Sequence, residues 1–221
     1  MTKHYPIIAL TGPAGSGKDT VADHLSDRYG YTKIAFADAL RLEICAAFGV
    51  HVDKLLDREG KEVPCKQLSL SRCNDHRFVG LILAKELQMD EASNEIVEAH
   101  ISQPRSPRWA MQLWGTEYRR EVFGEDYWIT ELAQSLADIN GPVVIPDCRF
   151  EGEAEFISVH GGEIWKLHRP DLALIATHKS EMPLPRYLID RDLDNTGDIA
   201  LLHKQAEHAL MMMDRARRGV A

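Results

Sequence analysis

Short apolar runs alternate with amphipathic stretches along most of the chain. Brief runs rich in β-branched residues predict buried strands at residues 5–11, 32–36, 142–145 and 163–167. Apolar residues that recur every three or four positions predict helices at 18–29, 39–48, 127–139, 153–159 and 197–218. Strands that alternate with helices indicate a parallel sheet covered on both faces, and such sheets bind ligands at the carboxyl ends of their strands.

The middle of the chain, from about residue 51 to 107, is more polar and carries no strand signal. We expect helices over 77–100 and 108–122, with Gly115 ending or kinking the second one. Turn formers in 171–191 predict a mobile excursion. The sequence therefore predicts one domain, 1–221, with a helical insertion at about 50–140 and a lid at about 170–190.

Composition narrows the class of protein. The 221 residues suffice for one domain with its own core. A formal net charge of −8 argues against a protein that coats nucleic acid, although a local basic cluster can still bind a small anion. No apolar run reaches the ~18 residues that span a bilayer, and the N-terminus lacks a signal-peptide pattern. Four scattered cysteines suit a reducing compartment, so we expect a cytoplasmic protein that binds neither nucleic acid nor membrane.

The clearest chemical motif is Gly12-x-x-x-x-Gly17-Lys18, which follows a predicted strand and opens a predicted helix. This order is typical of a P-loop. Glycines let the backbone turn its N–H groups toward phosphate oxygens, and the helix N-terminus adds a positive dipole end. The ammonium group of Lys18 can reach the β- and γ-phosphates. The alternative is an accidental glycine-rich turn.

The residue after this lysine is Asp19, where a P-loop usually has a Ser or Thr that ligates Mg²⁺. Mg²⁺ prefers oxygen ligands, so Asp19 can hold the metal directly or through water. An acidic residue in the first turn also stabilises a helix without any metal, and both interpretations stay open. Thr20 can instead donate to the α-phosphate.

Phosphoryl transfer needs positive groups around the migrating phosphate. Arg149 and Arg169 directly follow predicted strands. Arg41 follows the second predicted strand, and Arg108 begins the helix after the insertion. A single arginine is more often a solvated surface charge, but two of these lie on the expected ligand side of the sheet. Asp147 lies beyond the third strand, where a carboxylate can serve a metal or simply form a turn.

Two further groups of polar residues are weaker candidates. Gln112 and Thr116 lie in a helix rich in aromatic residues, which indicate packing, and the two polar side chains can read a base edge. The excursion carries polar residues where nucleotide-binding enzymes place a lid, and a plain surface loop is the alternative. These residues are His178, Lys179, Ser180 and Glu181.

Seven segments follow one another in a recognisable order: GPAGSGKDT (12–20), IAFADALR (34–41), SPRWAMQLWGTEYRREVFGEDYW (106–128), VVIPDCRFEGE (143–153), KLHRP (166–170), THKSEMPLP (177–185) and DNTGD (194–198). Together they resemble the deoxynucleoside monophosphate kinases encoded by tailed phages, over nearly the whole chain except about 50–104. The unusual GKD variant of the P-loop is itself similar to this family. The resemblance implies an α/β fold: a P-loop NTPase-type three-layer parallel sheet with a helical substrate-binding insertion and a lid.

The resemblance also implies ATP as phosphate donor, Mg²⁺ as metal with Asp19 as its candidate ligand, and a small-molecule deoxynucleoside monophosphate as acceptor. The ATP-binding residues would be Gly12, Ala14, Gly15, Ser16, Gly17, Lys18, Asp19, Thr20, Asn195 and Gly197. The acceptor would contact Arg41, Arg108, Gln112, Thr116, Asp147, Arg149 and Glu181. The residues that stabilise the moving phosphoryl group would be Lys18, Arg149 and Arg169.

Parts of the pattern occur in other proteins. Dephospho-coenzyme A kinases are similar in the P-loop, the FADALR-like segment and the closing Asn-x-Gly. Animal-type phosphomevalonate kinases are similar around GKD, WGTE and the Asp-x-Arg. A nucleotide-binding regulator without turnover is a further alternative, against which the additional arginines count. The segments RWAMQLWGTE and THKSEMPLP favour the deoxynucleotide enzyme, in the host cytoplasm if a phage encodes it. The accepted bases and a homodimeric state are left open.

Overall fold

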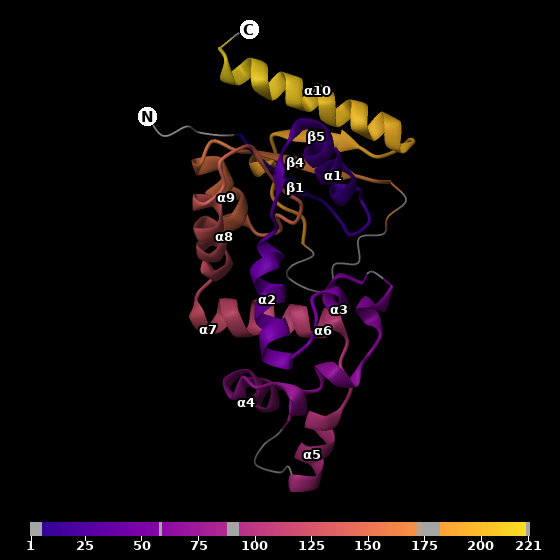
Figure 1. The fold of residues 1–221 in the computed structure, drawn as a ribbon, viewed down its shortest axis with the longest axis vertical. Coiled ribbons are helices and arrows are strands. Elements are labelled where there is room, and N and C mark those ends of the chain that lie inside the picture. Colours follow the sequence, from indigo (N-terminus) through magenta and orange to yellow (C-terminus); the bar gives the residue numbers. More distant parts are fainter. Residues whose placement is uncertain (1–5, 58, 88–92, 171, 173–181, 220–221) are drawn as a thin grey trace. The chain divides into compact units, whose positions relative to one another are not determined.

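A computed structural model of the chain describes residues 6–57, 59–87, 93–170, 172 and 182–219. The chain forms two compact units. The first unit comprises the residues up to Phe36 together with those from Ile129 onward, and the second comprises Ala37–Trp128 (Figure 1). The chain therefore leaves the first unit once and returns to it once.

The first unit is built on a parallel sheet of five strands in the order β2-β3-β1-β4-β5. Its strands are β1 (Ile7–Thr11), β2 (Thr32–Lys33), β3 (Val143–Ile145), β4 (Glu163–His168) and β5 (Arg191–Asp194). In the register, Ile8 of β1 pairs with Val144 on one side and with Glu163 on the other. Because all strands run the same way, the loops after β1, β3, β4 and β5 leave from one edge of the sheet.

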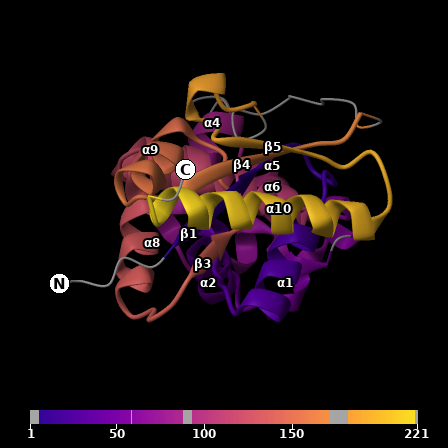
Figure 2. The ribbon, with the colours of Figure 1, turned by 90° about the horizontal axis from the view of Figure 1, so that it is seen from above.

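Helices cover both faces of this sheet. The covering helices are α1 (Lys18–Tyr29), α9 (Glu151–Val159) and α10 (Ile199–Arg217). Helix α10 packs on α1 and β5, whereas α9 packs on β1 and β4 (Figure 2). Side chains alternate along β1, so Ile8 and Leu10 join the core formed with α1 and α10, while buried Ala9 points to the other face. The predicted three-layer α/β fold is confirmed.

The second unit consists of helices and loops with one isolated antiparallel bridge, between Cys65 and Arg105, among its described residues. Its helices are α2 (Phe36–Phe48), α3 (Asp53–Leu56), α4 (His76–Glu86), α5 (Asn94–Ser102), α6 (Pro107–Gln112), a π-helix (Leu113–Arg120) and α7 (Glu121–Phe123). Short 3-10 turns occur at Gly60–Glu62, Lys66–Leu68 and Leu70–Arg72, and one more at Arg186–Leu188 of the first unit. Helix α8 (Tyr127–Ala137) begins in this unit and leads the chain back to the first.

Several predicted elements are wrong in extent. The strand expected at 32–36 ends at Lys33, and Phe36 already begins α2, because its backbone N–H donates to Asp147 Oδ1 at 2.9 Å. The single helix expected at 77–100 is two helices, and the second is capped by Ser93, whose Oγ accepts from the N–H of Ile96 at 3.4 Å. Gly115 does not end its helix but lies inside the π-helix. No strand was expected at β5 (Arg191–Asp194), whose first residue is the last of the expected excursion 171–191.

The expected subdivision of the chain stays a prediction. The helical unit begins at Ala37 and ends at Trp128, so its bounds lie earlier than the expected 50–140. Of the expected lid, residues 171 and 173–181 lie outside the described residues, and Glu181 is among them. No helix in the described part of the chain is long and apolar enough to cross a bilayer.

Candidate nucleotide site

The loop between β1 and α1 depends on glycine. Gly12, Gly15 and Gly17 have φ angles of 134°, 79° and 105°, which side-chain-bearing residues rarely adopt. A Cβ atom on Gly12 would lie 2.5 Å from the carbonyl oxygen of Leu167, and one on Gly17 would lie 2.8 Å from Nδ2 of Asn195. The glycines therefore allow both the turn and its close approach to β4 and to the segment that follows β5.

Lys18, the first residue of α1, folds over this loop. Its Nζ donates to the carbonyl oxygens of Gly12 at 2.7 Å and Pro13 at 2.8 Å. The ammonium group is thus held directly above the loop backbone, beside the positive end of the helix dipole. An anion in the loop therefore meets both a positive side chain and the first N–H groups of α1.

Ser16 is a fully buried residue whose hydroxyl oxygen has no hydrogen-bond partner among the described residues. A Cβ atom on Gly12 would lie 3.0 Å from this Oγ, so the hydroxyl lies inside the turn of the loop. Burying an unpaired hydroxyl costs free energy, so this group is available to a further hydrogen-bond partner. The sequence named Ser16 as an ATP-binding residue; its lack of a partner is a finding of the structure.

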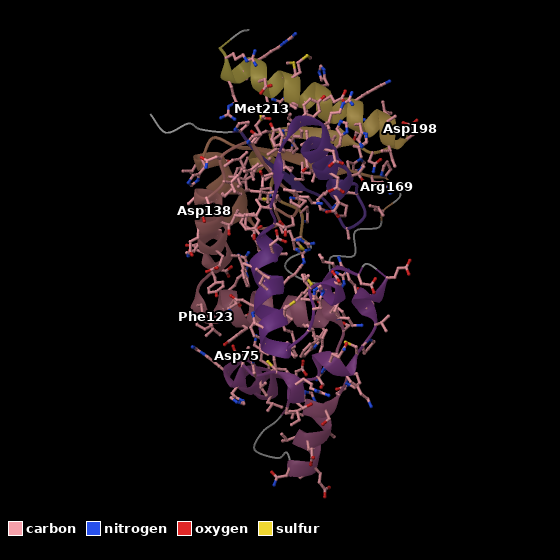
Figure 3. All side chains as sticks on the ribbon, in the orientation of Figure 1. Asp75, Phe123, Asp138, Arg169, Asp198 and Met213 are labelled. Atoms are coloured by element: carbon pink, nitrogen blue, oxygen red, sulfur yellow. The ribbon has the colours of Figure 1, made fainter. Side chains whose placement is uncertain are left out.

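Two segments at the same edge of the sheet attach to the loop. Asn195, directly after β5, donates from Nδ2 to the carbonyl oxygen of Ser16 at 3.0 Å, and its own N–H donates to His168 at 2.7 Å. Arg169, labelled in Figure 3, is exposed directly after β4. Its Nη1 donates to the carbonyl oxygen of Gly15 at 3.3 Å. Both residues therefore lie next to the glycine loop; the sequence placed Arg169 after a predicted strand, whereas Asn195 was named only through the resemblance.

The remaining candidates on the donor side lie around the same loop. Ala14 is exposed within it, and Thr20 is half-buried in the first turn of α1. Gly197 is exposed and precedes Asp198, which caps α10 by accepting from the N–H of Leu201 at 2.8 Å. Gly197 therefore lies two residues after Asn195 and directly before the N-cap residue of α10.

Asp19 forms an ion pair that the sequence did not suggest. Its Oδ1 lies 3.3 Å from Nζ of Lys33, which also lies 2.7 Å from Oδ1 of Asp23. Burial lowers the pKa of Lys33, but the hydrogen bond to Asp23 and the charges of both aspartates outweigh it, so the pKa lies above its usual value. A signal was present, because Asp19 and Asp23 are one helical turn apart and face one side of α1.

The loop after β3 is held at the same edge. The N–H of Cys148 donates to the carbonyl oxygen of Leu10 on β1 at 3.1 Å. Asp147, half-buried, accepts from the N–H of Phe36 and so holds the start of α2. The carboxylate of Asp147 therefore has a structural role, which is to hold the first residue of α2.

Arg149 is exposed at the end of that loop, while its backbone is fixed. Buried Glu153, in the first turn of α9, accepts from the N–H groups of Arg149 at 2.8 Å and Phe150 at 3.2 Å. A buried carboxylate that accepts two backbone N–H groups at a helix start fixes the chain direction there. The guanidinium of Arg149 is therefore presented from a rigid base.

The other expected acceptor residues belong to the helical unit. Arg41 lies on α2 and not directly after a strand; its Nη1 donates to Asp38 Oδ1 at 2.8 Å. Its Nε is buried with no hydrogen-bond partner in the described structure. Arg108 forms an ion pair with Glu62. Two candidates follow on the next helices: half-buried Gln112 and buried Thr116.

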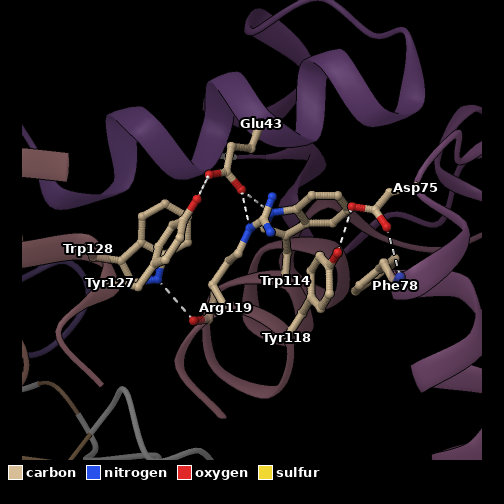
Figure 4. Close-up of polar contacts among 9 residues, drawn as sticks. Glu43, Asp75, Phe78, Trp114, Tyr118, Arg119, Tyr127 and Trp128 are labelled. Atoms are coloured by element: carbon tan, nitrogen blue, oxygen red, sulfur yellow. Dashed lines mark hydrogen bonds and ion pairs between the residues drawn. The ribbon is translucent and has the colours of Figure 1, made fainter. Parts of the chain in front are cut away.

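The sequence missed a half-buried polar cluster in this unit, around Glu43 of α2 (Figure 4). Glu43 accepts hydrogen bonds from Trp114 Nε1 at 2.7 Å, Arg119 Nε at 2.6 Å and Tyr127 OH at 2.5 Å. Burial lowers the pKa of Arg119, but the hydrogen bond and charge of Glu43 outweigh it and raise the pKa above its usual value. Nothing in the local sequence distinguishes Glu43 from a solvated residue on an amphipathic helix.

No protein-family model matches the chain. The chain is 30% identical over 179 residues to a protein of Acanthamoeba polyphaga mimivirus that carries the provisional name deoxynucleotide monophosphate kinase, covering 80% of this chain and 81% of that one. It is 32% identical over 177 residues to the deoxynucleoside-5'-monophosphate kinase of Escherichia phage T5, covering 68% and 71%. The chain belongs to the P-loop nucleoside monophosphate kinase family.

A further relative, the adenylate kinase of Pyrococcus abyssi, is 29% identical over 74% of this chain and 72% of that enzyme. The reaction type of this kinase is therefore phosphoryl transfer of the nucleoside monophosphate kinase class, with nucleotides as substrates. Among solved structures, the dephospho-CoA kinase from Campylobacter jejuni aligns with a TM-score of 0.44 at 14% identity, covering 97% of this chain and 98% of that one. A likeness of that degree does not bear on the acceptor.

Proposed function

We propose that this kinase transfers the γ-phosphoryl group of ATP to the 5′-phosphate of a deoxynucleoside monophosphate and releases ADP and a deoxynucleoside diphosphate. The observation that carries the proposal is the glycine loop with Lys18 above it and the unpaired hydroxyl of Ser16 inside it. The choice of a deoxynucleotide as acceptor is supported by the names of the mimivirus and phage T5 relatives.

On the donor side, the loop residues bind the phosphates of ATP. Backbone N–H groups from Gly15 to Thr20 and the Ser16 hydroxyl offer hydrogen-bond donors, and Lys18 offsets the negative charge of the phosphates. Asn195 holds the shape of the loop and, with Gly197, lies on the side proposed for adenine. Arg169 is assigned the stabilisation of the moving phosphoryl group, and its bond to the carbonyl oxygen of Gly15 supports this role.

The donor set at the start of α1 suits Mg²⁺. Asp19 and Thr20 supply a carboxylate and a hydroxyl oxygen in the first helical turn, the class of ligand that this cation prefers. Asp19 is exposed, and its carboxylate already forms an ion pair with the ammonium group of Lys33. The carboxylate can therefore pair with a cation in this position. When bound, Mg²⁺ would neutralise charge on the donor phosphates.

On the acceptor side, the chemistry needs no general base. A phosphate monoester has a second pKa of about 6, so the acceptor is mostly a dianion at neutral pH. The task of the protein is to align two anions and neutralise their repulsion. We assign this task to Arg41, Arg108 and Arg149, and the contacts to the base to Gln112 and Thr116. Asp147 and Glu181 complete the proposed acceptor set.

The decisive experiment is a panel of acceptors with purified protein, ATP and Mg²⁺, read as ADP release. The panel contains dAMP, dGMP, dCMP, dTMP, AMP, dephospho-coenzyme A, phosphomevalonate and a sample without acceptor. We expect ADP release that depends on at least one deoxynucleoside monophosphate. Activity only with dephospho-coenzyme A or phosphomevalonate would assign the chain to another acceptor, and no acceptor-dependent release at all would indicate a regulator.

A further inference from the structure

Glu43 joins three segments of the helical unit that lie far apart in the sequence. Its two carboxylate oxygens accept from Trp114 and Arg119 of the π-helix and from Tyr127 of α8. Bonds between charged and polar groups in a half-buried place are short and directional, so three of them fix the carboxylate and its partners together. The cluster therefore locks one face of the π-helix to α2.

Aromatic rings enclose Arg119, the cationic partner of Glu43. The guanidinium carbon lies 4.6 Å from the ring centre of Tyr118, 4.9 Å from that of Phe123 and 5.2 Å from that of Tyr127. Trp114 adds a fourth ring at 5.4 Å. Cations over ring faces are stabilised when water is excluded. Arg119 is thus held within this cluster, and we assign the contacts to the acceptor to other residues.

The same locked contact lies beside the residues assigned to the acceptor. A Cβ atom on Gly115 would lie 3.5 Å from Leu40, so the π-helix and α2 touch at these two positions. Leu40 directly precedes Arg41, and Gly115 directly precedes Thr116. The carbonyl oxygen of Gly115 in turn accepts from Trp128 Nε1 at 2.9 Å. A π-helix in place of an ordinary helical turn shifts the side chains that follow it, and such segments are frequent at functional sites.

We propose that Glu43 is a positioning residue for the phosphate acceptor: its bonds to Trp114, Arg119 and Tyr127 set the orientation of Arg41 on α2 relative to Thr116 on the π-helix. This inference rests on the proposed function, because it takes the acceptor roles of Arg41 and Thr116 from there. Misplacement of a binding group by about 1 Å can cost up to 100-fold in rate, so a residue that only orients these two side chains has a measurable effect.

The test compares Glu43→Gln with a matched control, Glu163→Gln. Glu163 is a half-buried glutamate that also bonds a tryptophan and an arginine, Trp165 at 2.8 Å and Arg191 at 2.6 Å, but in the first unit. The measurements are KM for the monophosphate, KM for ATP, kcat and the melting temperature. Glu43→Gln should raise KM for the monophosphate by roughly tenfold and leave KM for ATP within about twofold. Glu163→Gln should leave the ratio of the two KM values unchanged.

A purely structural role of Glu43 would lower the melting temperature of both variants alike and leave the ratio of KM values unchanged, which would overturn the inference. If Glu43→Gln does not fold, Tyr127→Phe removes one of the three bonds and keeps the ring. It should raise KM for the monophosphate by about threefold, and an unchanged value would again overturn the inference. A wild-type protein that uses no monophosphate would overturn the proposed function as well, so the two failures are distinguishable.

Discussion

The side-chain amide of Asn195 donates to the backbone carbonyl of Ser16 at 3.0 Å and joins residues 179 positions apart. Ser16 carries the buried unpaired hydroxyl of the glycine loop. The residue that follows β5 therefore supports the loop that is proposed to bind phosphate, although β5 is an outermost strand and is not adjacent to β1 in the sheet. A residue proposed to lie near adenine thus also shapes the phosphate-binding backbone.

Replacing Asn195 by Ala should weaken ATP binding. The variant loses the hydrogen bond to the carbonyl oxygen of Ser16. Because that carbonyl is then no longer held, the neighbouring N–H groups of the loop shift with it. We expect KM for ATP to rise by about tenfold with a smaller change in KM for the monophosphate. Gln205→Ala is the control, because the side chain of Gln205 on α10 accepts from the N–H of Asp194 and donates to its carbonyl oxygen, both at 2.8 Å, and so ties down the end of β5 without bonding the glycine loop in the described structure. Equal effects of the two variants would contradict the role given to Asn195.

Gly12→Ala should destabilise the folded protein by straining the loop after β1. The new Cβ would clash with the carbonyl oxygen of Leu167 at 2.5 Å, and the φ of 134° is unfavourable for alanine. We expect a loss of about 2 kcal/mol or more in the free energy of unfolding, measured with urea. Gly30→Ala serves as the control, because its φ of 70° is also positive but no atom lies within 4 Å of its Cβ position. That variant should lose only about 1 kcal/mol.

Lys18→Ala should abolish most turnover without unfolding the protein. Nζ of Lys18 donates to two carbonyl oxygens of the loop, and its charge is assigned to the phosphates. We expect kcat to fall by a factor of about 100 to 1,000. Circular dichroism melts should show a folded protein. Residual activity near that of the wild type would show that another group neutralises the donor phosphates.

Arg149→Ala should impair use of the acceptor. The arginine stands on the fixed loop after β3, exposed at the ligand edge of the sheet, and a lost contact to a phosphate dianion is strongly unfavourable. We expect KM for the monophosphate to rise by about tenfold or more, with KM for ATP nearly unchanged. A change confined to KM for ATP would move Arg149 to the donor side.

Tyr118 gives a prediction for alkaline pH. Burial raises the pKa of Tyr118 to about 12, helped by its hydrogen bond to Asp75 at 2.8 Å and the negative charge of Asp75. In the unfolded chain the phenol ionises at its ordinary pKa of 10.0, before it does in the folded protein. The stabilisation is therefore complete below pH 10 and is lost as the pH rises toward 12. Tyr118→Phe should be less stable than the wild type at neutral pH and show a shallower loss of stability between pH 10 and 12.

The parts of the fold that depend on neighbouring residues could be predicted from the sequence. The glycine spacing of the P-loop and the helix from Lys18 to Tyr29 agree with the structure, because backbone freedom and helical periodicity are local properties. The central strand is a short apolar run and is equally evident. For the site, Arg169 was found by its place after a predicted strand and Asn195 only through the family resemblance, and both bond to the loop.

The parts that depend on distant residues could not be predicted. Phe36 continues an apolar run and suggests a strand, yet it starts a helix because Asp147, 111 positions later, accepts from its N–H. Strand β5 has the sequence RDLD and becomes a strand only by pairing with β4 at the sheet edge. Glu43 finds its partners 71 to 84 positions later, so its neighbours are not visible in the local pattern.

The interruption of the first unit between Phe36 and Ile129 separates two sets of proposed site residues along the chain. The hydrogen bonds described for the glycine loop come from residues before Ala37 or after Trp128. On the proposed assignment, the side chains that read the base come from the interposed 92 positions, 37–128. On that assignment, substitutions within 37–128 can change which nucleobase is accepted and leave in place every hydrogen bond described for the glycine loop.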